Sequence, residues 1–231
     1  MMNVADRLAE IRARMAEACL QAGRQTADVR IIGVTKYGDI DAAREVLAAG
    51  CLDLGESRPQ ELWRKAEALA DAAPAPRWHL IGHLQRNKVR RTLGVVSLIH
   101  TLDSRRLLAA VDEEAARQGR ICEALVEVNL AADPSRTGAS EAEAGDLVAA
   151  ARVCSHVRIC GLMGMASVPE GSDASAQARR QFALLRELRD RLRRDLSVDT
   201  LTELSMGMSG DYFDAILEGA TMVRIGSALF E

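Results

Sequence analysis

The sequence has few aromatic residues and no excess of positive charge. Phe, Trp and Tyr make up only 3% of the 231 residues, and the formal net charge is −3. Proteins that bind nucleic acids usually present a basic surface or aromatic side chains on which bases stack. The composition therefore argues against a nucleic-acid partner.

Long hydrophobic runs are also missing. The amino terminus reaches the charged residues Asp6 and Arg7 before any apolar run, unlike a signal peptide. The apolar run at 94–100 ends far short of the about 18 residues that a membrane span needs. We therefore expect a soluble, cytoplasmic protein without a membrane partner.

Cysteine and histidine are too scattered to indicate disulfides or a metal site. The five cysteines are an odd number, show no C-x-x-C spacing and lie among apolar residues, which is typical of reduced core cysteines. His79 and His83 have the spacing of a helical metal pair, but residues 78–82 have the pattern of a strand followed by a loop. We expect no bound metal.

What the chain does contain is enough apolar sequence for one core. Hydrophobic residues make up 48% of the chain, and a length of 231 residues leaves little room for a second domain. We therefore expect residues 1–231 to form a single domain.

Short apolar runs alternate with amphipathic stretches along this domain. Val4, Leu8, Ile11 and Met15 recur at three- and four-residue intervals, which predicts an N-terminal helix. Alternating βα units favour a (β/α)8 TIM barrel, in the α/β class, over a doubly wound sheet. The predicted strands are eight short runs, at 30–36, 51–54, 78–81, 95–99, 124–128, 157–163, 202–205 and 221–225.

Lys36 is an unusual residue to end a predicted buried strand. A barrel strand delivers its last side chain into the mouth where active sites assemble. A partly desolvated amine loses its proton more readily and can then condense with an aldehyde to give a Schiff base. The alternative is a lysine at a strand end whose ammonium group extends into solvent.

Glycine and serine follow the last two predicted strands, where barrels commonly bind phosphate. Glycines let the backbone approach an anion, serines offer hydroxyl groups, and the next helices begin with unpaired N–H groups. Such sequences also form ordinary turns, so this pattern is weak by itself. The residues concerned are Ser205, Gly207, Ser209, Gly210, Gly226 and Ser227.

Arg224 lies between Val223 and Ile225, so its guanidinium is expected to be largely buried and to need a partner. The partner is either a bound ligand or a barrel carboxylate such as Glu203.

Several longer motifs resemble the YggS/PROSC family of homeostasis proteins that bind pyridoxal 5′-phosphate (PLP). This family is related in fold to the barrel domain of bacterial alanine racemase. The resemblance extends over nearly the whole chain and rests on the segments 33–36, 54–57, 78–88, 161–165, 204–209 and 219–230.

The resemblance implies PLP as cofactor and assigns a role to individual residues. Lys36 would hold PLP as a Schiff base, and Arg224 would face the pyridine nitrogen. Ser205 and the turn at Gly226 and Ser227 would hold the phosphate. The other predicted cofactor-binding residues are Ser57, His79, Met165, Met206 and Gly207, of which His79, Met165 and Met206 would line the ring pocket.

Two positions depart from the family pattern. Ser57 stands where the family usually has Asn, and Tyr37 and Gly38 follow Lys36 where a proline or a small residue is common. Contacts that the family makes through that Asn are therefore open for this chain.

An arginine opposite the ring also bears on activity. A guanidinium cannot accept a hydrogen bond from a protonated pyridine nitrogen, so the nitrogen should stay unprotonated and the ring should withdraw electrons weakly. Because the chain ends at Glu231, we expect no second domain to supply a further catalytic residue. We therefore predict a monomer without strong catalytic turnover that acts in PLP and amino-acid homeostasis, with cofactor-free PLP enzymes as candidate partners. The alternatives are a weak PLP-dependent racemase or lyase and a PLP-free scaffold.

Overall fold

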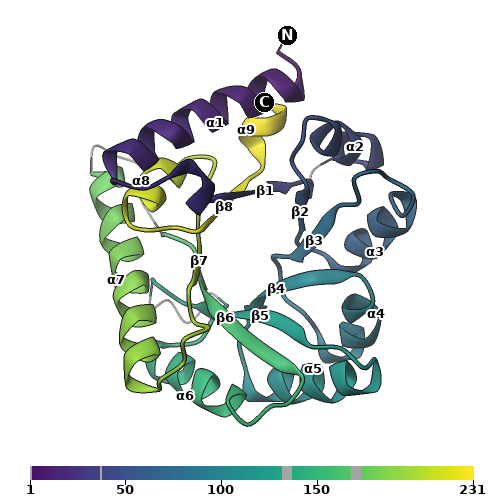
Figure 1. The fold of residues 1–231 in the computed structure, drawn as a ribbon, viewed down its shortest axis with the longest axis vertical. Coiled ribbons are helices and arrows are strands. Elements are labelled where there is room, and N and C mark those ends of the chain that lie inside the picture. Colours follow the sequence, from purple (N-terminus) through teal and green to yellow (C-terminus); the bar gives the residue numbers. More distant parts are fainter. Residues whose placement is uncertain (1, 37, 132–136, 168–172) are drawn as a thin grey trace.

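In the computed structural model of the chain, eight parallel strands form a closed barrel (Figure 1). The structure describes residues 2–36, 38–131, 137–167 and 173–231. Each strand pairs with the next along the chain, and β1 pairs with β8 to close the ring. The strands are β1 (Arg30–Val34), β2 (Asp53–Glu56), β3 (Arg77–Leu80), β4 (Val96–Leu102), β5 (Cys122–Val128), β6 (Val157–Gly164), β7 (Glu203–Met208) and β8 (Met222–Ile225).

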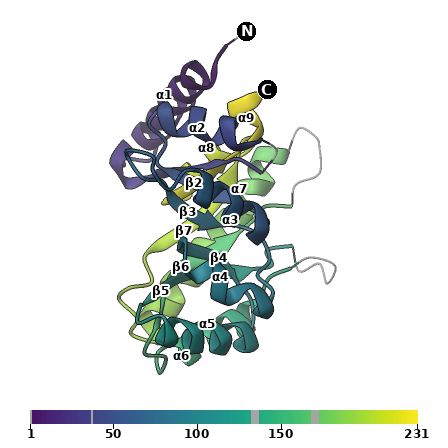
Figure 2. The same ribbon diagram turned by 90° about the vertical axis from the view of Figure 1, so that its right-hand side faces the viewer.

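Helices surround this barrel on the outside and return the chain from one strand to the next (Figures 1 and 2). The N-terminal helix α1 precedes the barrel and packs against α8 and α9 beside the closing strands. The helices are α1 (Val4–Gln21), α2 (Ile40–Ala48), α3 (Pro59–Ala68), α4 (Val89–Leu93), α5 (Arg105–Arg117), α6 (Glu141–Ala151), α7 (Ala174–Asp195), α8 (Tyr212–Leu217) and α9 (Ser227–Phe230), with 3-10 turns at Thr26–Asp28 and Arg86–Lys88.

The predicted (β/α)8 barrel with an extra N-terminal helix is confirmed, with shifted strand boundaries. Strand β1 ends at Val34, so Lys36 lies in the following turn and not on the strand itself. Strand β2 begins at Asp53 and runs to Glu56, two residues later than predicted. Apolar periodicity missed Glu56 because its side chain is buried through pairing with Lys65, a feature that hydrophobicity does not report.

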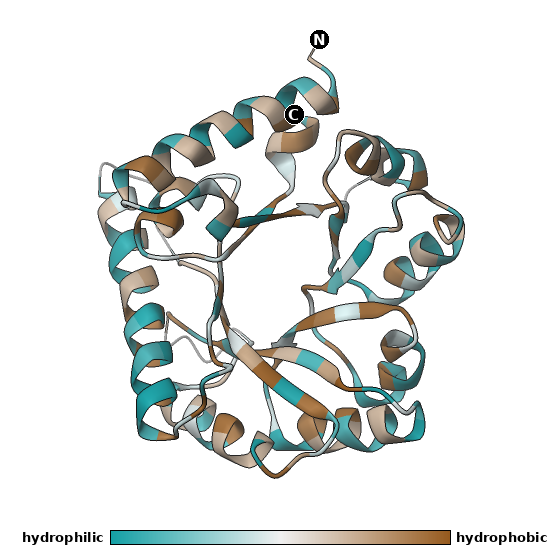
Figure 3. Cartoon of the chain, in the orientation of Figure 1, coloured by the Kyte–Doolittle hydropathy of each residue, from teal (hydrophilic) through white to brown (hydrophobic). Residues whose placement is uncertain are grey.

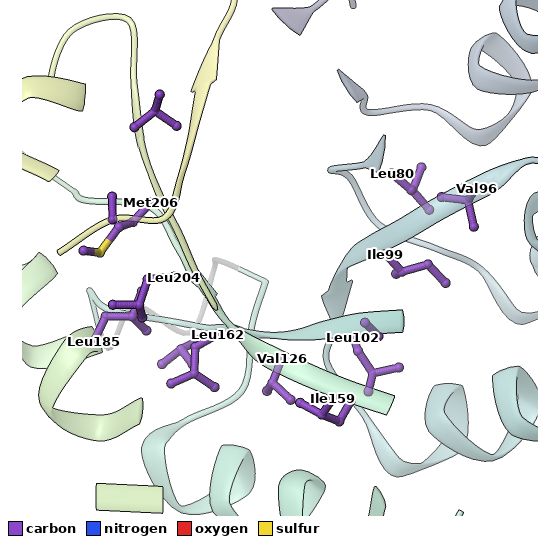
Figure 4. Close-up of a cluster of buried hydrophobic side chains, with 14 of the residues drawn as sticks. Leu80, Val96, Ile99, Leu102, Val126, Ile159, Leu162, Leu185, Leu204 and Met206 are labelled. Carbon is purple, nitrogen blue, oxygen red and sulfur yellow. The ribbon is translucent and has the colours of Figure 1, made fainter. Parts of the chain in front are cut away.

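The larger hydrophobic core lies between the strands and the surrounding helices. Figure 3 shows the outer helix faces as largely hydrophilic, with hydrophobic residues on the strands and the inner helix faces. Met206 and Leu204 of β7 lie beside Leu185 of α7 in this core (Figure 4). Both β7 residues therefore point outward from the barrel, although they precede the C-terminal mouth.

The barrel interior holds a second, smaller apolar cluster and several charged pairs. Its apolar members, which alternate along their strands with outer-core residues, are Ile32, Leu98, Leu125, Met163 and Met222. Ion pairs lie at the first residues of the strands, at the N-terminal end of the barrel. They join Arg30 to Glu203, Arg77 to Asp53 and Arg158 to Glu123.

The described residues contain neither a helix that could span a membrane nor a cluster of side chains that could hold a metal ion. Among the described helices, none is long and apolar enough to cross a membrane. The same part of the chain contains no group of three or more His, Cys, Asp or Glu side chains arranged to hold a metal ion.

Candidate functional site at the C-terminal end of the barrel

Lys36 and the glycine-serine turn after β8 lie at the same end of neighbouring strands. Gly33 of β1 is paired with Ile225 of β8, so the chain beyond both strands emerges side by side. Lys36 itself is exposed, whereas the preceding Thr35 is fully buried. The expected partial desolvation of the amine is therefore not seen in this structure. The predicted neighbourhood of the lysine and the turn is present.

A second, buried lysine anchors the turn that carries Lys36. The Lys65 ammonium on α3 donates to the Thr35 carbonyl at 2.7 Å, the Gly38 carbonyl at 2.8 Å and the Glu56 carboxylate at 2.6 Å. Its side chain and that of Glu56 are each 1% exposed. Because an ammonium has three N–H groups, these acceptors satisfy it completely. No local sequence signal predicts this role, because a helical lysine is usually solvated.

The turn after β7 folds over the start of α9. The Ser209 hydroxyl accepts the backbone N–H groups of Gly226 at 3.2 Å and Ala228 at 3.3 Å. Gly207, near the end of β7, has a φ of +91°, and a Cβ there would lie 2.6 Å from Ala215 Cβ. Only glycine combines that backbone conformation with such close packing. Two N–H groups thus converge on one oxygen, an arrangement that also suits an anion.

Ser205 lies deeper in the barrel than its predicted contact with the phosphate requires. Its residue is fully buried, and its hydroxyl bonds to His100 Nδ1 at 2.8 Å and accepts from Arg224 Nη1 at 2.7 Å. The inward direction of alternate β7 residues explains this position. The hydroxyl that faces the Gly226 turn is therefore that of Ser209, whereas the sequence predicted Ser205.

Arg224 is buried as predicted, but Glu203 is not its partner. Glu203 pairs with Arg30 at 2.7 Å, at the other end of the barrel. Besides Ser205, Arg224 donates from Nη2 to the Gly164 carbonyl at 3.0 Å. Burial lowers the pKa of Arg224 to about 10 although two nearby carboxylates oppose the effect. The guanidinium therefore remains charged at neutral pH.

Those carboxylates are Glu127 of β5 and Asp211, which precedes α8. Burial raises the pKa of both carboxyl groups, and the positive charge of Arg224 partly opposes this rise. Glu127 accepts a hydrogen bond from Thr137 at 2.8 Å. Neither residue was predicted from the sequence, because a lone carboxylate in a strand or turn carries no motif.

Two predicted ring contacts need correction. The His79 side chain is 2% exposed, bonds to Asp53 and His100 inside the barrel, and lines a cavity at the N-terminal end. Met206 belongs to the outer core, as Figure 4 shows. Neither side chain faces the C-terminal mouth, because strand depth displaces the first and strand alternation the second.

The other predicted site residues lie at strand ends on the expected side. Ser57, directly after β2, is half-buried, and its carbonyl packs against Gly82, which follows β3. Met165, directly after β6, is 37% exposed, and Ser227 is half-buried at the start of α9. Their contacts with a cofactor stay predictions, and Tyr37 lies outside the described residues.

The buried histidines should make the protein sensitive to mild acid. Burial lowers the pKa of His79, although the Asp53 carboxylate partly opposes this effect. The pKa of His100 is lowered well below its usual value by burial and by the nearby His79 and Arg224. Below about pH 6.5 the unfolded chain therefore binds protons that the folded barrel does not, and the free energy of unfolding falls. Each histidine contributes a slope of about 1.4 kcal/mol per pH unit.

Urea unfolding between pH 5 and 8 measures this slope. We expect His100→Gln to reduce it by about one proton, since glutamine does not titrate. Near pH 8, where neither histidine binds a proton in either state, the two curves should run parallel. An unchanged slope in the variant below pH 6.5 would contradict a neutral His100.

Comparison with known proteins first defines the class. Residues 7–231 match the sequence model of the family described as alanine racemase, N-terminal domain. An alanine racemase from Clostridium difficile has the same fold, with a TM-score of 0.74 and 15% identity over 99% of this chain and 56% of that one. The chain is thus a barrel of the alanine racemase N-terminal class.

Closer relatives share far more of the sequence. A pyridoxal phosphate homeostasis protein of Aquifex aeolicus is 37% identical over 99% of this chain and 98% of its own. The one from Pseudomonas aeruginosa is 36% identical over 100% and 96%. PipY of Synechococcus elongatus, solved with PLP bound, has a TM-score of 0.86 and 34% identity over 99% of this chain and 100% of that one. The chain belongs to the pyridoxal phosphate homeostasis protein family.

Proposed function

We propose that this protein binds PLP at the C-terminal end of its barrel and acts in PLP homeostasis. The observation that carries the proposal is the placement of an exposed amine and converging backbone N–H groups beyond two paired strands, β1 and β8. One group can hold an aldehyde and the other a phosphate. The PLP-bound structure of the relative PipY supports the same ligand.

The residues present fit PLP, with Ser209 in place of Ser205 at the phosphate and without His79 and Met206 at the ring. Lys36 would hold the cofactor covalently as a Schiff base, and Ser209, Gly226, Ser227 and Ala228 would surround its phosphate. Gly226 and Ala228 already donate to an oxygen at this position, which the phosphate oxygens would take over. PLP supplies an aldehyde and a ring that can accept electrons.

Arg224 would set how strongly the ring accepts electrons. It enters the barrel from β8 and carries its charge at neutral pH, so it can donate a hydrogen bond to an unprotonated ring nitrogen but cannot accept one from a protonated nitrogen. An unprotonated ring nitrogen withdraws electrons weakly, which disfavours removal of a proton from a bound amino acid. This supports holding and transfer of PLP over catalytic turnover.

Two measurements on the PLP-loaded protein separate these functions. We expect PLP to pass to a cofactor-free PLP enzyme, read as restored activity of that enzyme, while L-amino acids in deuterated water keep their α-protons. The Lys36→Ala variant is the control, because it removes the amine that either function requires.

Glu127 and Asp211 give the enzymatic alternative a physical basis, since a buried and a half-buried carboxylate, both with raised pKa, lie near Arg224. Strong α-proton exchange or racemisation that depends on Lys36 would favour a racemase or lyase and overturn the carrier function. Failure of both reactions, without any bound PLP, would overturn PLP binding itself.

A further inference from the structure

Five side chains from five strands form a continuous hydrogen-bond chain through the barrel interior. His79 Nε2 lies 2.9 Å from Asp53 Oδ1, and His79 Nδ1 lies 2.9 Å from His100 Nε2. His100 Nδ1 lies 2.8 Å from Ser205 Oγ, which accepts from Arg224 Nη1 at 2.7 Å. None of the five residues is more than 6% exposed. The chain joins the N-terminal end of β2 to the guanidinium on β8.

The Asp53 end fixes the direction of every bond in this chain. Burial raises the pKa of Asp53, but hydrogen bonds from Arg77 and His79 outweigh it, so the carboxylate is ionised and can only accept. His79 must therefore carry its proton on Nε2. Since His79 is neutral, its Nδ1 accepts, and His100 must donate from Nε2. Neutral His100 then accepts at Nδ1 from the Ser205 hydroxyl.

The Arg224 end is compatible with the same direction. A guanidinium has only donors, so Ser205 Oγ must accept from it. The single hydroxyl proton of Ser205 is then free to point at His100 Nδ1. In every bond the donor lies on the Arg224 side and the acceptor on the Asp53 side. Each group in the chain therefore turns its acceptor atom toward the guanidinium. Aligned bonds of this kind polarise and strengthen one another in a low-dielectric interior.

We propose that Asp53, His79 and His100 are positioning residues that hold the Arg224 guanidinium through this one-directional chain. The chain would fix where the guanidinium N–H groups point at the C-terminal mouth. The function of that orientation, a hydrogen bond to the PLP ring nitrogen, rests on the proposed function. The direction of the chain itself does not, so it can be tested without a cofactor.

Histidine nitrogen NMR on the cofactor-free protein tests the direction. At pH 7 we expect His79 and His100 both as neutral rings protonated on Nε2. A ring protonated on Nδ1, or a charged imidazolium, at either position overturns the proposal.

Asp53→Asn tests whether the carboxylate sets the direction. An amide can accept from His79 Nε2 or donate to it, so the variant should show a mixture of both tautomers. The matched control is Glu123→Gln, because Glu123 also pairs with an arginine, Arg158, at the same end but lies outside the chain. It should leave both histidines unchanged. Unchanged tautomers in Asp53→Asn, or an equal change in the control, count against the proposal.

Substitutions of His100 test the link to Arg224. His100→Leu removes both bonds, while His100→Gln keeps one donor and one acceptor. In cofactor-free protein, the Arg224 guanidinium N–H protons should exchange faster with solvent in the leucine variant and recover in the glutamine variant. Equal exchange in wild type and His100→Leu would overturn the link.

Loading the same variants with PLP adds the functional readout. We expect roughly tenfold weaker PLP binding in His100→Leu, the size of one hydrogen bond to a charged group, with a shifted ring-nitrogen signal. Recovery in His100→Gln distinguishes positioning from a general loss of structure. If wild type binds no PLP, the proposed function fails while the exchange and tautomer results still decide the chain. If PLP binds and His100→Leu changes neither affinity nor signal, the positioning role fails.

Discussion

Lys36→Ala should abolish covalent attachment of PLP. Borohydride reduction of the loaded protein turns a Schiff base into a stable secondary amine, which peptide mapping by mass spectrometry locates. We expect the phosphopyridoxyl group on Lys36 in the unchanged protein and on no residue in the variant. The expected loss is complete, because no neighbouring amine can replace this one.

The chain itself narrows the candidates, since its sequence contains three lysines: Lys36, Lys65 and Lys88. Lys65 is buried and its ammonium is held by three acceptors, so it is not available to an aldehyde. Lys88 is half-buried in the 3-10 turn before α4. Lys88→Ala is therefore the matched control and should keep full labelling. A label on Lys88, or labelling that survives in Lys36→Ala, would contradict the assignment of the Schiff base to Lys36.

Ser209→Ala should weaken binding of PLP more than binding of pyridoxal, which lacks the phosphate. The Ser209 hydroxyl faces the N–H groups of Gly226 and Ala228, where we propose the phosphate. Losing one hydrogen bond to a charged group costs about 1.5–3 kcal/mol, or roughly ten- to a hundredfold in affinity. Titration with each ligand, followed by absorbance, measures the two dissociation constants.

Ser205→Ala is the informative control for this prediction. The sequence alone assigned the phosphate to Ser205, whereas its hydroxyl lies inside the barrel between His100 and Arg224. If the structural assignment holds, Ser205→Ala changes the affinities for PLP and pyridoxal by the same factor. A selective loss of PLP binding in Ser205→Ala, with little effect of Ser209→Ala, would restore the original assignment.

The repeated alternation of apolar runs and amphipathic stretches determined the barrel from the sequence alone. Strand and helix periods differ, and a regular succession of both has few ways to bury its apolar faces. The position of Lys36 at the end of the first strand and the glycine-serine sequences after the last two followed from the same pattern. Parallel strands then bring those ends together without further information, because all their C-terminal ends lie on one face.

Depth and direction within the barrel were decided only by the tertiary structure. Ser205 and Ser209 lie in one short motif, yet Ser205 points into the interior and Ser209 lies in the turn after β7. His79 and Met206 were displaced from the predicted pocket for the same reason, because strand register fixes how deep each side chain lies and on which side of the sheet.

Buried polar partners were equally invisible to the sequence. Lys65 under the turn of Lys36, and His100 between His79 and Ser205, have no local signature. Their partners lie on other strands and in the turn after β1, 9 to 105 residues away along the chain. The sequence alone thus determined that Lys36 and the glycine-serine turn after β8 lie at the same end of the barrel. Only the closed barrel decided which hydroxyl faces the turn and what holds Arg224, because burial forces each polar group to find a partner across strands.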